Sequence, residues 1–244
     1  MGASSFQAFG DLAASDLTNT VKAGRHAFQA EAEEHIAYNI ASRLELSKDD
    51  NLLDIGCGTG NVTIRLLPYV KSITVVDHPN VVDALLARPA AMDRIYGHRG
   101  DWLRDGVDAV EGKCFHKILI YSVLHYLSFE KEVWSFLESA LDLLWTGGKL
   151  MVGDIPNIDR KRRFEATTFG AAFSKAWAAR SNGSDNKHFA TIAADENRIE
   201  FDDAMILRLM KELELGAKDY IVLPQPSTLP FGHTREDIII TNPG

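Results

Sequence analysis

The stretch Asn51-Leu-Leu-Asp-Ile-Gly-Cys-Gly-Thr-Gly-Asn-Val62 decides the fold of this chain. Its apolar run stops at Gly56, further glycines follow at positions 58 and 60, and a helical pattern starts at Asn61. This order predicts a strand, a glycine turn and a helix, because glycine permits positive φ and lets backbone N–H groups approach a ligand. The N-terminus of the helix adds unpaired N–H donors and partial positive charge. We therefore expect a ligand to bind at this turn.

The next strand of the sequence, residues 73–76, ends in Asp77. A carboxylate in this position accepts both hydroxyls of a ribose in nucleotide-binding folds. The dinucleotide fingerprint Gly-x-Gly-x-x-Gly does not fit, because position 61, where its third glycine would fall, is Asn61. Asp54, shortly before the first glycine, suits a cofactor with a positively charged amino-acid part better than a pyrophosphate. Alternatively, Asp54 is a buried acid that accepts hydrogen bonds from N–H groups of the loop.

Taken together, Asp54-x-Gly56-x-Gly58-x-Gly60 resembles motif I of the class I S-adenosylmethionine-dependent methyltransferases. Gly100-Asp101-Trp102 resembles the family motif whose acid accepts the adenine amino group and whose next side chain packs on the base. The stretches 116–125 and 145–152 resemble the fourth strand with its following turn and the turn into the fifth strand. The likeness extends from about Glu31 to Thr241 and implies S-adenosyl-L-methionine as the cofactor.

Alternating strands and helices predict an α/β fold with helices on both faces of a mostly parallel sheet. The resemblance implies seven strands, of which 219–223 and 236–240 would be the last two, with an antiparallel last strand. Helical patterns cover 29–46 and 130–145, and another helix begins after Asp202 as its N-cap. We expect one methyltransferase domain, residues 1–244. A helical cap would consist of an N-terminal segment, 1–28, and an insertion, 156–200, between the fifth strand and the last helix.

Composition excludes several other classes of protein. Lys and Arg number 26 against 34 Asp and Glu, a net charge of −8, which argues against nucleic acid and anionic membranes as partners. No apolar run approaches the roughly 20 residues of a membrane span, and the N-terminus does not look like a signal peptide. Cys57 and Cys114 have no metal-ligand spacing, so we expect no metal. These features predict a cytoplasmic protein with a small-molecule partner, and a homo-oligomer is compatible with them.

The resemblance and the turn chemistry together give a set of expected cofactor ligands. Asp101 would bind the cofactor or only cap a turn. Tyr121 and Ser122 would bind the cofactor or only pack at the end of their strand. The complete expected set is Asp54, Gly56, Cys57, Gly58, Gly60, Asp77, His78, Gly100, Asp101, Trp102, Tyr121 and Ser122.

Candidate residues for the chemistry follow the fourth and fifth strands. His125 lies where the family commonly meets the transferred methyl group, and a neutral imidazole can accept a proton at pH 7. A histidine that only shapes the pocket is the competing interpretation, because methyl transfer needs positioning more than acid–base chemistry. Beyond the fifth strand, Asp154 and Asn157 would bind acceptor hydroxyls or merely cap the next helix. Arg162 and Arg163 belong to a basic run, which would bind an anionic acceptor or be a solvated face.

The predicted function is methyl transfer from S-adenosylmethionine to an oxygen or nitrogen of a small molecule, such as a sugar or another anionic metabolite. Two alternatives remain at this point. A cofactor-binding but inactive partner or regulator would share the same motifs. A nicotinamide-dependent oxidoreductase would share the fold, although Asn61 counts against it.

Overall fold

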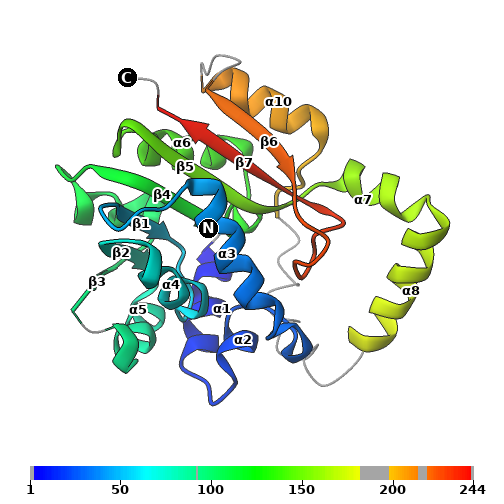
Figure 1. Ribbon diagram of the computed structural model, residues 1–244, viewed down its shortest axis with the longest axis horizontal. Helices are drawn as coiled ribbons and strands as arrows, with labels where there is room; N and C mark the ends of the chain where they lie inside the picture. The colour runs from blue at the N-terminus through cyan, green and yellow to red at the C-terminus, as the bar shows by residue number, and fades with distance from the viewer. Residues whose placement is uncertain (1–2, 92, 182–197, 214–218, 243–244) are drawn as a thin grey trace.

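The computed structural model describes residues 3–91, 93–181, 198–213 and 219–242. Its centre is a seven-stranded sheet in the order β3-β2-β1-β4-β5-β7-β6 (Figure 1). The strands are β1 Asn51–Ile55, β2 Ser72–Asp77, β3 Ile95–Arg99, β4 Phe115–Tyr121, β5 Leu144–Pro156, β6 Tyr220–Pro224 and β7 Arg235–Thr241. Strands β1 to β5 pair in parallel, and β7 is antiparallel to both of its neighbours. The predicted fold class is thereby confirmed.

Helices cover both faces of this sheet (Figure 1). One face is covered by α3 Ala32–Leu44, α4 Asn61–Leu66 and α5 Pro79–Leu86, and the other by α6 Glu130–Leu141 and α10 Asp203–Glu212. The remaining helices are α1 Ala3–Ala13, α2 Asn19–Lys22, α7 Ile158–Glu165 and α8 Thr168–Ser181. Short helical turns occur at Ala27–Gln29, Leu67–Tyr69, Pro89–Ala91, Trp102–Gly106, Asp108–Val110 and Leu124–Tyr126.

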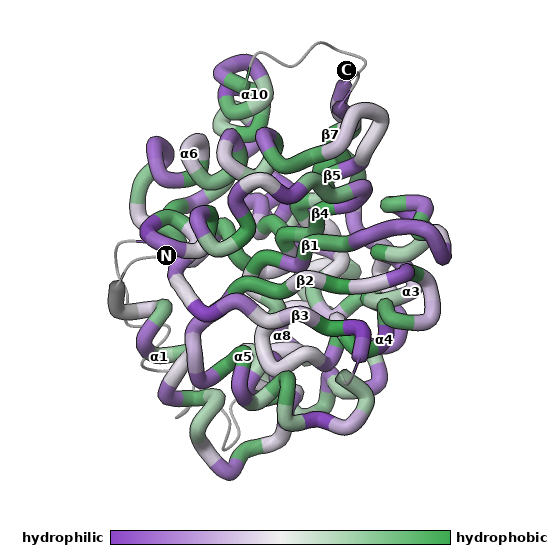
Figure 2. Tube along the Cα trace, turned by 90° about the vertical axis from the view of Figure 1, so that its left-hand side faces the viewer, coloured by the Kyte–Doolittle hydropathy of each residue, from purple (hydrophilic) through white to green (hydrophobic). Residues whose placement is uncertain are grey.

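The central strands are buried on both faces, because each alternates between two hydrophobic cores. In β1, Leu53 faces the core under α6 and α10, whereas Leu52 faces the core under α3, α4 and α5. In β4, Ile120 faces the core under α6 and α10, and Leu119 faces the core under α3, α4 and α5. Figure 2 shows the result as hydrophobic stretches along the central strands. This two-sided burial is typical of parallel sheets, and it leaves the strand ends as the place for polar chemistry.

Two expected helix boundaries need correction. The helix expected over 130–145 ends at Leu141, and Trp145 already belongs to β5, because Leu144 pairs with Phe115 of β4. The helix expected over 29–46 is α3, which ends at Leu44 where Glu45 turns left-handed with φ of 53°. Both apolar patterns continued past the helix end, because Leu143 and Leu144 are buried in the same core as α6 and the partly buried Leu46 packs against the same core as α3.

The described parts of the two segments expected to form the cap are largely helical. Segment 1–28 contains α1 and α2, and α1 packs on α5, where Asn80 Nδ2 donates to the Gly10 carbonyl at 3.2 Å. After β5, α7 and α8 form an arm that projects beside the body of the protein (Figure 1). Residues 182–197 of the expected insertion lie outside the described residues. The division into cap and insertion within one domain stays a prediction.

A buried polar cluster fastens β7 to α3 and β5. Asp237 on β7 is fully buried, and its carboxylate accepts hydrogen bonds from Arg43 Nη1 at 2.6 Å and Gln225 Nε2 at 2.8 Å. It also accepts the backbone N–H of Asp154 at 2.9 Å and the amide of Asn39 at 3.3 Å. Burial raises the pKa of Asp237, and these donors oppose the rise. The cluster therefore holds β7 in place between β5 and β6 and ties it to α3.

Replacing Asp237 by Ala should destabilise the fold strongly, because it leaves Arg43, whose side chain is only 15% exposed, and the buried donors Gln225 and Asn39 without their acceptor. We expect the free energy of unfolding to fall by about 3–5 kcal/mol in urea denaturation. The control is Arg99→Ala, which breaks an ion pair with Asp83 whose side chains are 48% and 58% exposed. That change should cost less than about 1 kcal/mol, and equal losses in the two variants would contradict the assigned role of Asp237.

Candidate active site

The glycine turn after β1 is the structural centre of the site. Gly56, Gly58 and Gly60 have φ of 80°, 55° and 81°, a region that other residues rarely adopt. A Cβ on Gly60 would lie 2.0 Å from Leu85 Cδ1, and one on Gly56 would lie 2.4 Å from Val123 Cγ2. A Cβ on Gly58 would meet nothing within 4 Å. The turn is thus tightly packed at both ends and open at Gly58, where a ligand can approach the backbone.

Two buried carboxylates face this turn from neighbouring strands. Asp77, at the end of β2, accepts the Gly58 amide at 2.9 Å and the His78 amide at 2.6 Å. Burial raises its pKa to about 6, and the two amides oppose that rise. Asp54 of β1 accepts the Thr63 hydroxyl at 2.7 Å, and burial raises its pKa to about 7. Burying two negatively charged carboxylates at one turn costs free energy, which favours a ligand that brings positive charge and hydroxyl donors.

Most of the expected cofactor ligands line two adjoining cavities at the carboxyl ends of β1, β2 and β4. The two cavities share Gly56, Asp77 and Val123. The larger is lined by Asp54, Gly56, Cys57, Gly58, Asp77, Tyr121 and Ser122, and the smaller by Gly100, Asp101 and Trp102. Gly60 and His78 line neither, although Gly60 shapes the turn and His78 accepts the Asn80 amide as the N-cap of α5.

Helix α1 covers this site. Phe9 lines the larger cavity, and Phe6 lines the smaller one and packs on His78 with ring centroids 4.8 Å apart. The larger cavity measures about 70 Å³, whereas pockets for cofactors and drug-sized ligands usually measure roughly 300–1,000 Å³. A nucleoside cofactor would therefore need α1 to shift outward. Lys22 and Arg25, which follow α1 in the chain, also line the larger cavity and would face a ligand carboxylate.

The geometry of Gly100-Asp101-Trp102 is compatible with both roles that the sequence allowed for Asp101. Asp101 Oδ1 accepts the Leu103 amide at 3.1 Å and so caps the turn. Its side chain also lines the smaller cavity together with Trp102. The indole N–H of Trp102 donates to Ser139 Oγ at 2.9 Å, which fixes the ring between this cavity and the core. The adenine role of Asp101 stays a prediction.

Ser122 and Asp154 join the ends of β4 and β5. Each has φ of 61°, and the Ser122 hydroxyl donates to the Asp154 carboxylate. Arg235 Nε lies 3.6 Å from the same carboxylate. Asp154 lines neither of the cavities described so far nor the acceptor cavity described next, so its predicted contact with acceptor hydroxyls is untested.

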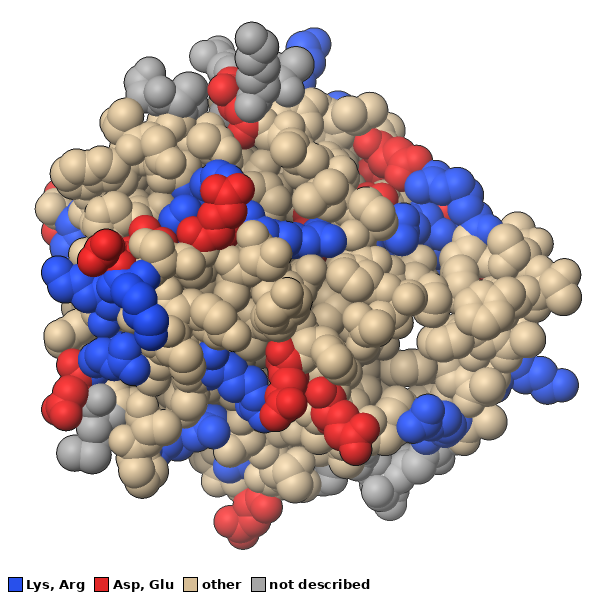
Figure 3. Space-filling model, in the orientation of Figure 1, with Lys and Arg blue, Asp and Glu red and all other residues tan. Residues whose placement is uncertain are grey.

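A third cavity, of about 660 Å³, lies between the α7–α8 arm and the body. Figure 3 shows the hollow beside the arm, on the right-hand side, bordered mainly by uncharged residues. Phe164, Phe173, Trp177, Phe231 and His233 form its aromatic wall. We call it the acceptor cavity. Tyr126 lines both this cavity and the larger cofactor cavity, so the two spaces meet at one side chain.

His125 lies in the acceptor cavity next to Tyr126, with ring centroids 4.2 Å apart. Burial lowers the pKa of His125 well below its usual value, and the positive charges of Arg235 and Arg198 lower it further. The imidazole is therefore neutral at pH 7 and has a free electron pair for a proton. The predicted catalytic residue thus lines the acceptor cavity beside Tyr126, the residue that this cavity shares with the larger cofactor cavity, while its role stays a prediction.

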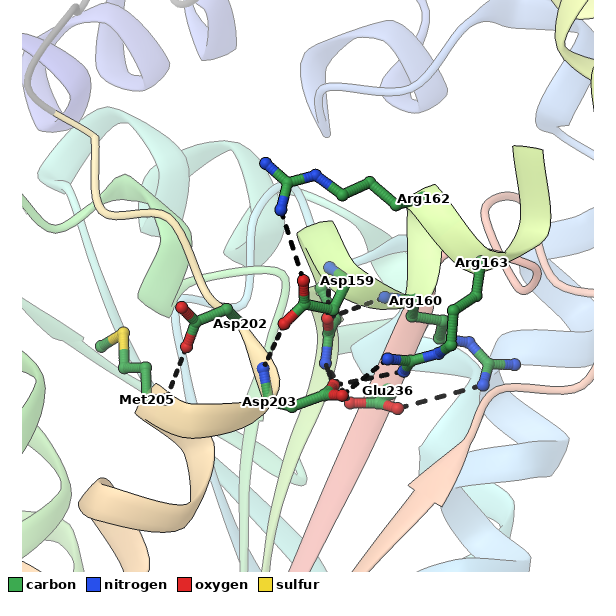
Figure 4. A network of polar contacts seen from close by, with 9 residues as sticks. Asp159, Arg160, Arg162, Arg163, Asp202, Asp203, Met205 and Glu236 are labelled. Carbon is green, nitrogen blue, oxygen red and sulfur yellow. Dashed lines mark hydrogen bonds and ion pairs between the residues drawn. The ribbon is translucent and has the colours of Figure 1, made fainter. Parts of the chain in front are cut away.

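The basic run that follows β5 lies at the base of the arm (Figure 4). Arg162 pairs with Asp159 at 3.4 Å, and its side chain is 75% exposed. Arg163 pairs with Asp203 of α10 at 2.6 Å. Neither side chain lines the acceptor cavity, so the geometry favours a role in fastening α7, and the predicted acceptor contact of both residues stays untested.

Asn157 is a structural residue at the same base. Its side-chain oxygen accepts the amides of Asp159 and Arg160 as the N-cap of α7. Its amide nitrogen donates to Asp203 at 2.8 Å and Glu236 at 2.7 Å. Asn157 also lines the acceptor cavity, so capping and acceptor binding are compatible.

Sequence reasoning did not single out Tyr126, Arg198 and Arg235, all of which line the acceptor cavity. Tyr126 follows His125 directly, and this adjacency was the available signal. The two arginines come from distant parts of the chain and carry no motif.

The described helices include none with the length and apolar character of a membrane span. In the same part of the chain, no cluster of three or more His, Cys, Asp or Glu side chains could hold a metal ion.

Comparison with known proteins identifies relatives. The family model of nodulation protein S (NodS) matches residues 16–211. Nodulation protein S of Sinorhizobium fredii (strain NBRC 101917 / NGR234) is 27% identical over 135 residues, which are 54% of this chain and 61% of that protein. The match thus spans less than two thirds of that relative.

Solved structures share the fold. N-methyltransferase NodS from Bradyrhizobium japonicum WM9, in complex with S-adenosyl-L-homocysteine, superposes with a TM-score of 0.62 at 18% identity, covering 99% of this chain and 100% of that one. An O-methyltransferase family 2 protein from Planctomyces limnophilus DSM 3776, in complex with apigenin, gives a TM-score of 0.54 at 19% identity, covering 88% of this chain and 60% of that one. The resemblance to class I S-adenosylmethionine-dependent methyltransferases is confirmed.

Replacing Asp77 by Ala should weaken binding of S-adenosylhomocysteine at least about tenfold, because hydrogen bonds to a charged acceptor contribute roughly 1.5–3 kcal/mol each. Calorimetric titration measures the dissociation constant. Asp77→Asn keeps the shape of the side chain and separates loss of charge from disturbance of the turn. Asp83→Ala, on the exposed side of α5, is the matched control and should bind normally. An unchanged dissociation constant in Asp77→Ala would mean that another acid holds the ribose.

Proposed function

The chain belongs to the nodulation protein S family, and on this premise we propose that it transfers a methyl group from S-adenosylmethionine to an oxygen or nitrogen of a small-molecule acceptor. The observation that carries the proposal is the meeting of two cavities at Tyr126. One has the glycine turn and two buried carboxylates, and the other is large enough for a small organic molecule.

The residues of the first cavity fit this cofactor. Asp77 would bind the ribose hydroxyls, and the open Gly58 lets the ligand approach the backbone. The buried Asp54 would face the positively charged amino-acid part, and Arg25 would face its carboxylate. S-Adenosylmethionine, when bound, supplies a methyl group on a positively charged sulfur. Binding of that cation relieves the cost of burying Asp54 and Asp77 as anions.

The residues around Tyr126 would position the acceptor and exclude water. The acceptor must approach the methyl group in line, and this alignment provides most of the rate increase in such reactions. His125 would take the proton that the acceptor oxygen or nitrogen loses, since its imidazole is neutral and borders the acceptor cavity. This assignment depends on the placement of His125 and not on a strong basicity, because its pKa is lowered.

A small organic molecule is the class of acceptor that the cavity favours. The net charge of −8 argues against nucleic acid as the acceptor. The relative from Planctomyces limnophilus was solved with apigenin, which supports an acceptor of similar size for the 660 Å³ cavity.

The acidic composition and the two free cysteines support a cytoplasmic location.

Replacing His125 by Gln tests the chemical step. We expect kcat for an identified acceptor to fall by about 100-fold or more, which is the usual contribution of a general base, while S-adenosylhomocysteine affinity stays unchanged. The assay follows transfer of a labelled methyl group from S-adenosylmethionine to panels of small hydroxyl and amine compounds. A fall of less than about threefold would leave His125 as a residue that only shapes the pocket. Tight cofactor binding without transfer to any acceptor would instead favour an inactive cofactor-binding regulator.

A further inference from the structure

We propose that the acceptor is a flat ring compound with a singly charged anionic group, and that Arg198 and Arg235 bind this group in the acceptor cavity. The inference rests on the proposed function and specifies its substrate class. It starts from two features of the cavity: an aromatic wall, and buried guanidinium N–H groups that have no hydrogen-bond partner among the described residues.

The aromatic wall fits a ligand with a flat ring. Phe164 and His233 are stacked, with centroids 4.5 Å apart and an interplanar angle of 4°. Phe173 and Trp177 are also stacked, at 6.2 Å and 20°, and Phe231 packs on Trp177 at 5.4 Å. All five rings line the cavity. Such surfaces bind flat rings by stacked and edge-to-face contacts.

Arg198 has buried donors that no described residue satisfies. Its Nε and Nη2 atoms are buried without a hydrogen-bond partner. The guanidinium lies over the ring of Tyr126, with its Cζ 4.9 Å from the ring centroid. A buried donor without a partner is costly, and a guanidinium offers its N–H groups in a geometry that fits a carboxylate. Its place over Tyr126 puts the anion close to the junction with the cofactor cavity.

Arg235 also has buried donors that favour an anionic ligand. Its Nε and Nη1 atoms are buried without a hydrogen-bond partner in the described part of the chain. Its charge is only partly balanced, since Asp154 Oδ1 lies 3.6 Å from Nε and the other oxygen of that carboxylate accepts the Ser122 hydroxyl. The guanidinium also lies over Phe231, with Cζ 5.0 Å from the ring centroid. It thus connects the aromatic wall with the anion site.

The charges around the cavity leave room for one anion. Lys161 and Glu165 line it and pair with each other at 4.0 Å. Glu200 also lines it but is exposed to solvent, where its charge is screened. Asp154 offsets Arg235 in part, and Arg198 has no ion pair among the described residues. One guanidinium that no described carboxylate compensates favours a carboxylate over a doubly charged group.

The test uses 2-naphthoate and its neutral analogue 2-naphthamide, two flat probes of nearly equal shape, in calorimetric titrations of the full chain. We expect the wild type to bind the carboxylate about tenfold more tightly than the amide, as a charge-assisted pair would give. Arg198→Gln should remove this preference and leave amide binding unchanged. Arg235→Gln should reduce it, and Arg208→Gln, which breaks an exposed pair with Glu130, should retain it in full.

Three outcomes would overturn the inference: no binding of 2-naphthoate by the wild type, equal binding of the two probes, or an unchanged preference in Arg198→Gln. Loss of the preference in Arg162→Gln/Arg163→Gln but not in Arg198→Gln would place the anion on the outside of the arm. S-Adenosylhomocysteine is titrated separately on each variant. If it binds while the naphthoate preference is absent, only this inference fails, and if it does not bind at all, the proposed function fails.

Discussion

The hydrogen bond from the Gly58 amide to the Asp77 carboxylate is the interaction on which the site depends. It joins the turn after β1 to the end of β2, and it forms only because the glycines turn left-handed and Gly60 fits against Leu85. The same carboxylate is buried, so the folded chain keeps a charge where its pKa is raised to about 6. Such a charge costs stability unless a ligand compensates it, which is a common property of functional sites.

The acceptor side depends on a different constraint, the attachment of β7 to α3 and to the end of β5. Asp237 binds Arg43 of α3 and the backbone of Asp154, so the end of β5 is held in place. Arg235, two residues before Asp237 on β7, thereby reaches the cavity from a strand that is held in place. The arm contributes Phe164, Phe173 and Trp177 to the aromatic wall. Ion pairs at the base of the arm, such as Arg163 with Asp203, are largely exposed and should add little to stability.

Most of the residues that the sequence singled out for the cofactor line the same pair of cavities, because their chemistry is local. A glycine turn fixes backbone geometry within a few residues, and Asp77 follows from the strand that pairs with it. The acceptor side was harder to predict, since Arg198 and Arg235 come to line one cavity only in the folded chain and neither belongs to a periodic pattern. Arg162 and Arg163 stood out as a charge run, yet a run on a short helix marks an exposed face as readily as a site. The end of α6 was misplaced because β5 continues its apolar pattern.

Proton release on cofactor binding tests the central claim most directly. Asp54 and Asp77, with pKa values raised to about 7 and about 6, are partly protonated in the free protein near neutral pH. A cationic ligand favours their charged forms and lowers both values, so binding should release protons and tighten as pH rises from about 5 to about 8. Calorimetry with S-adenosylmethionine in buffers of different ionisation enthalpy counts these protons. The account predicts net release near pH 6.5, about midway between the two values, and tighter binding at higher pH. Absence of binding, or binding without proton release or pH dependence, would contradict it.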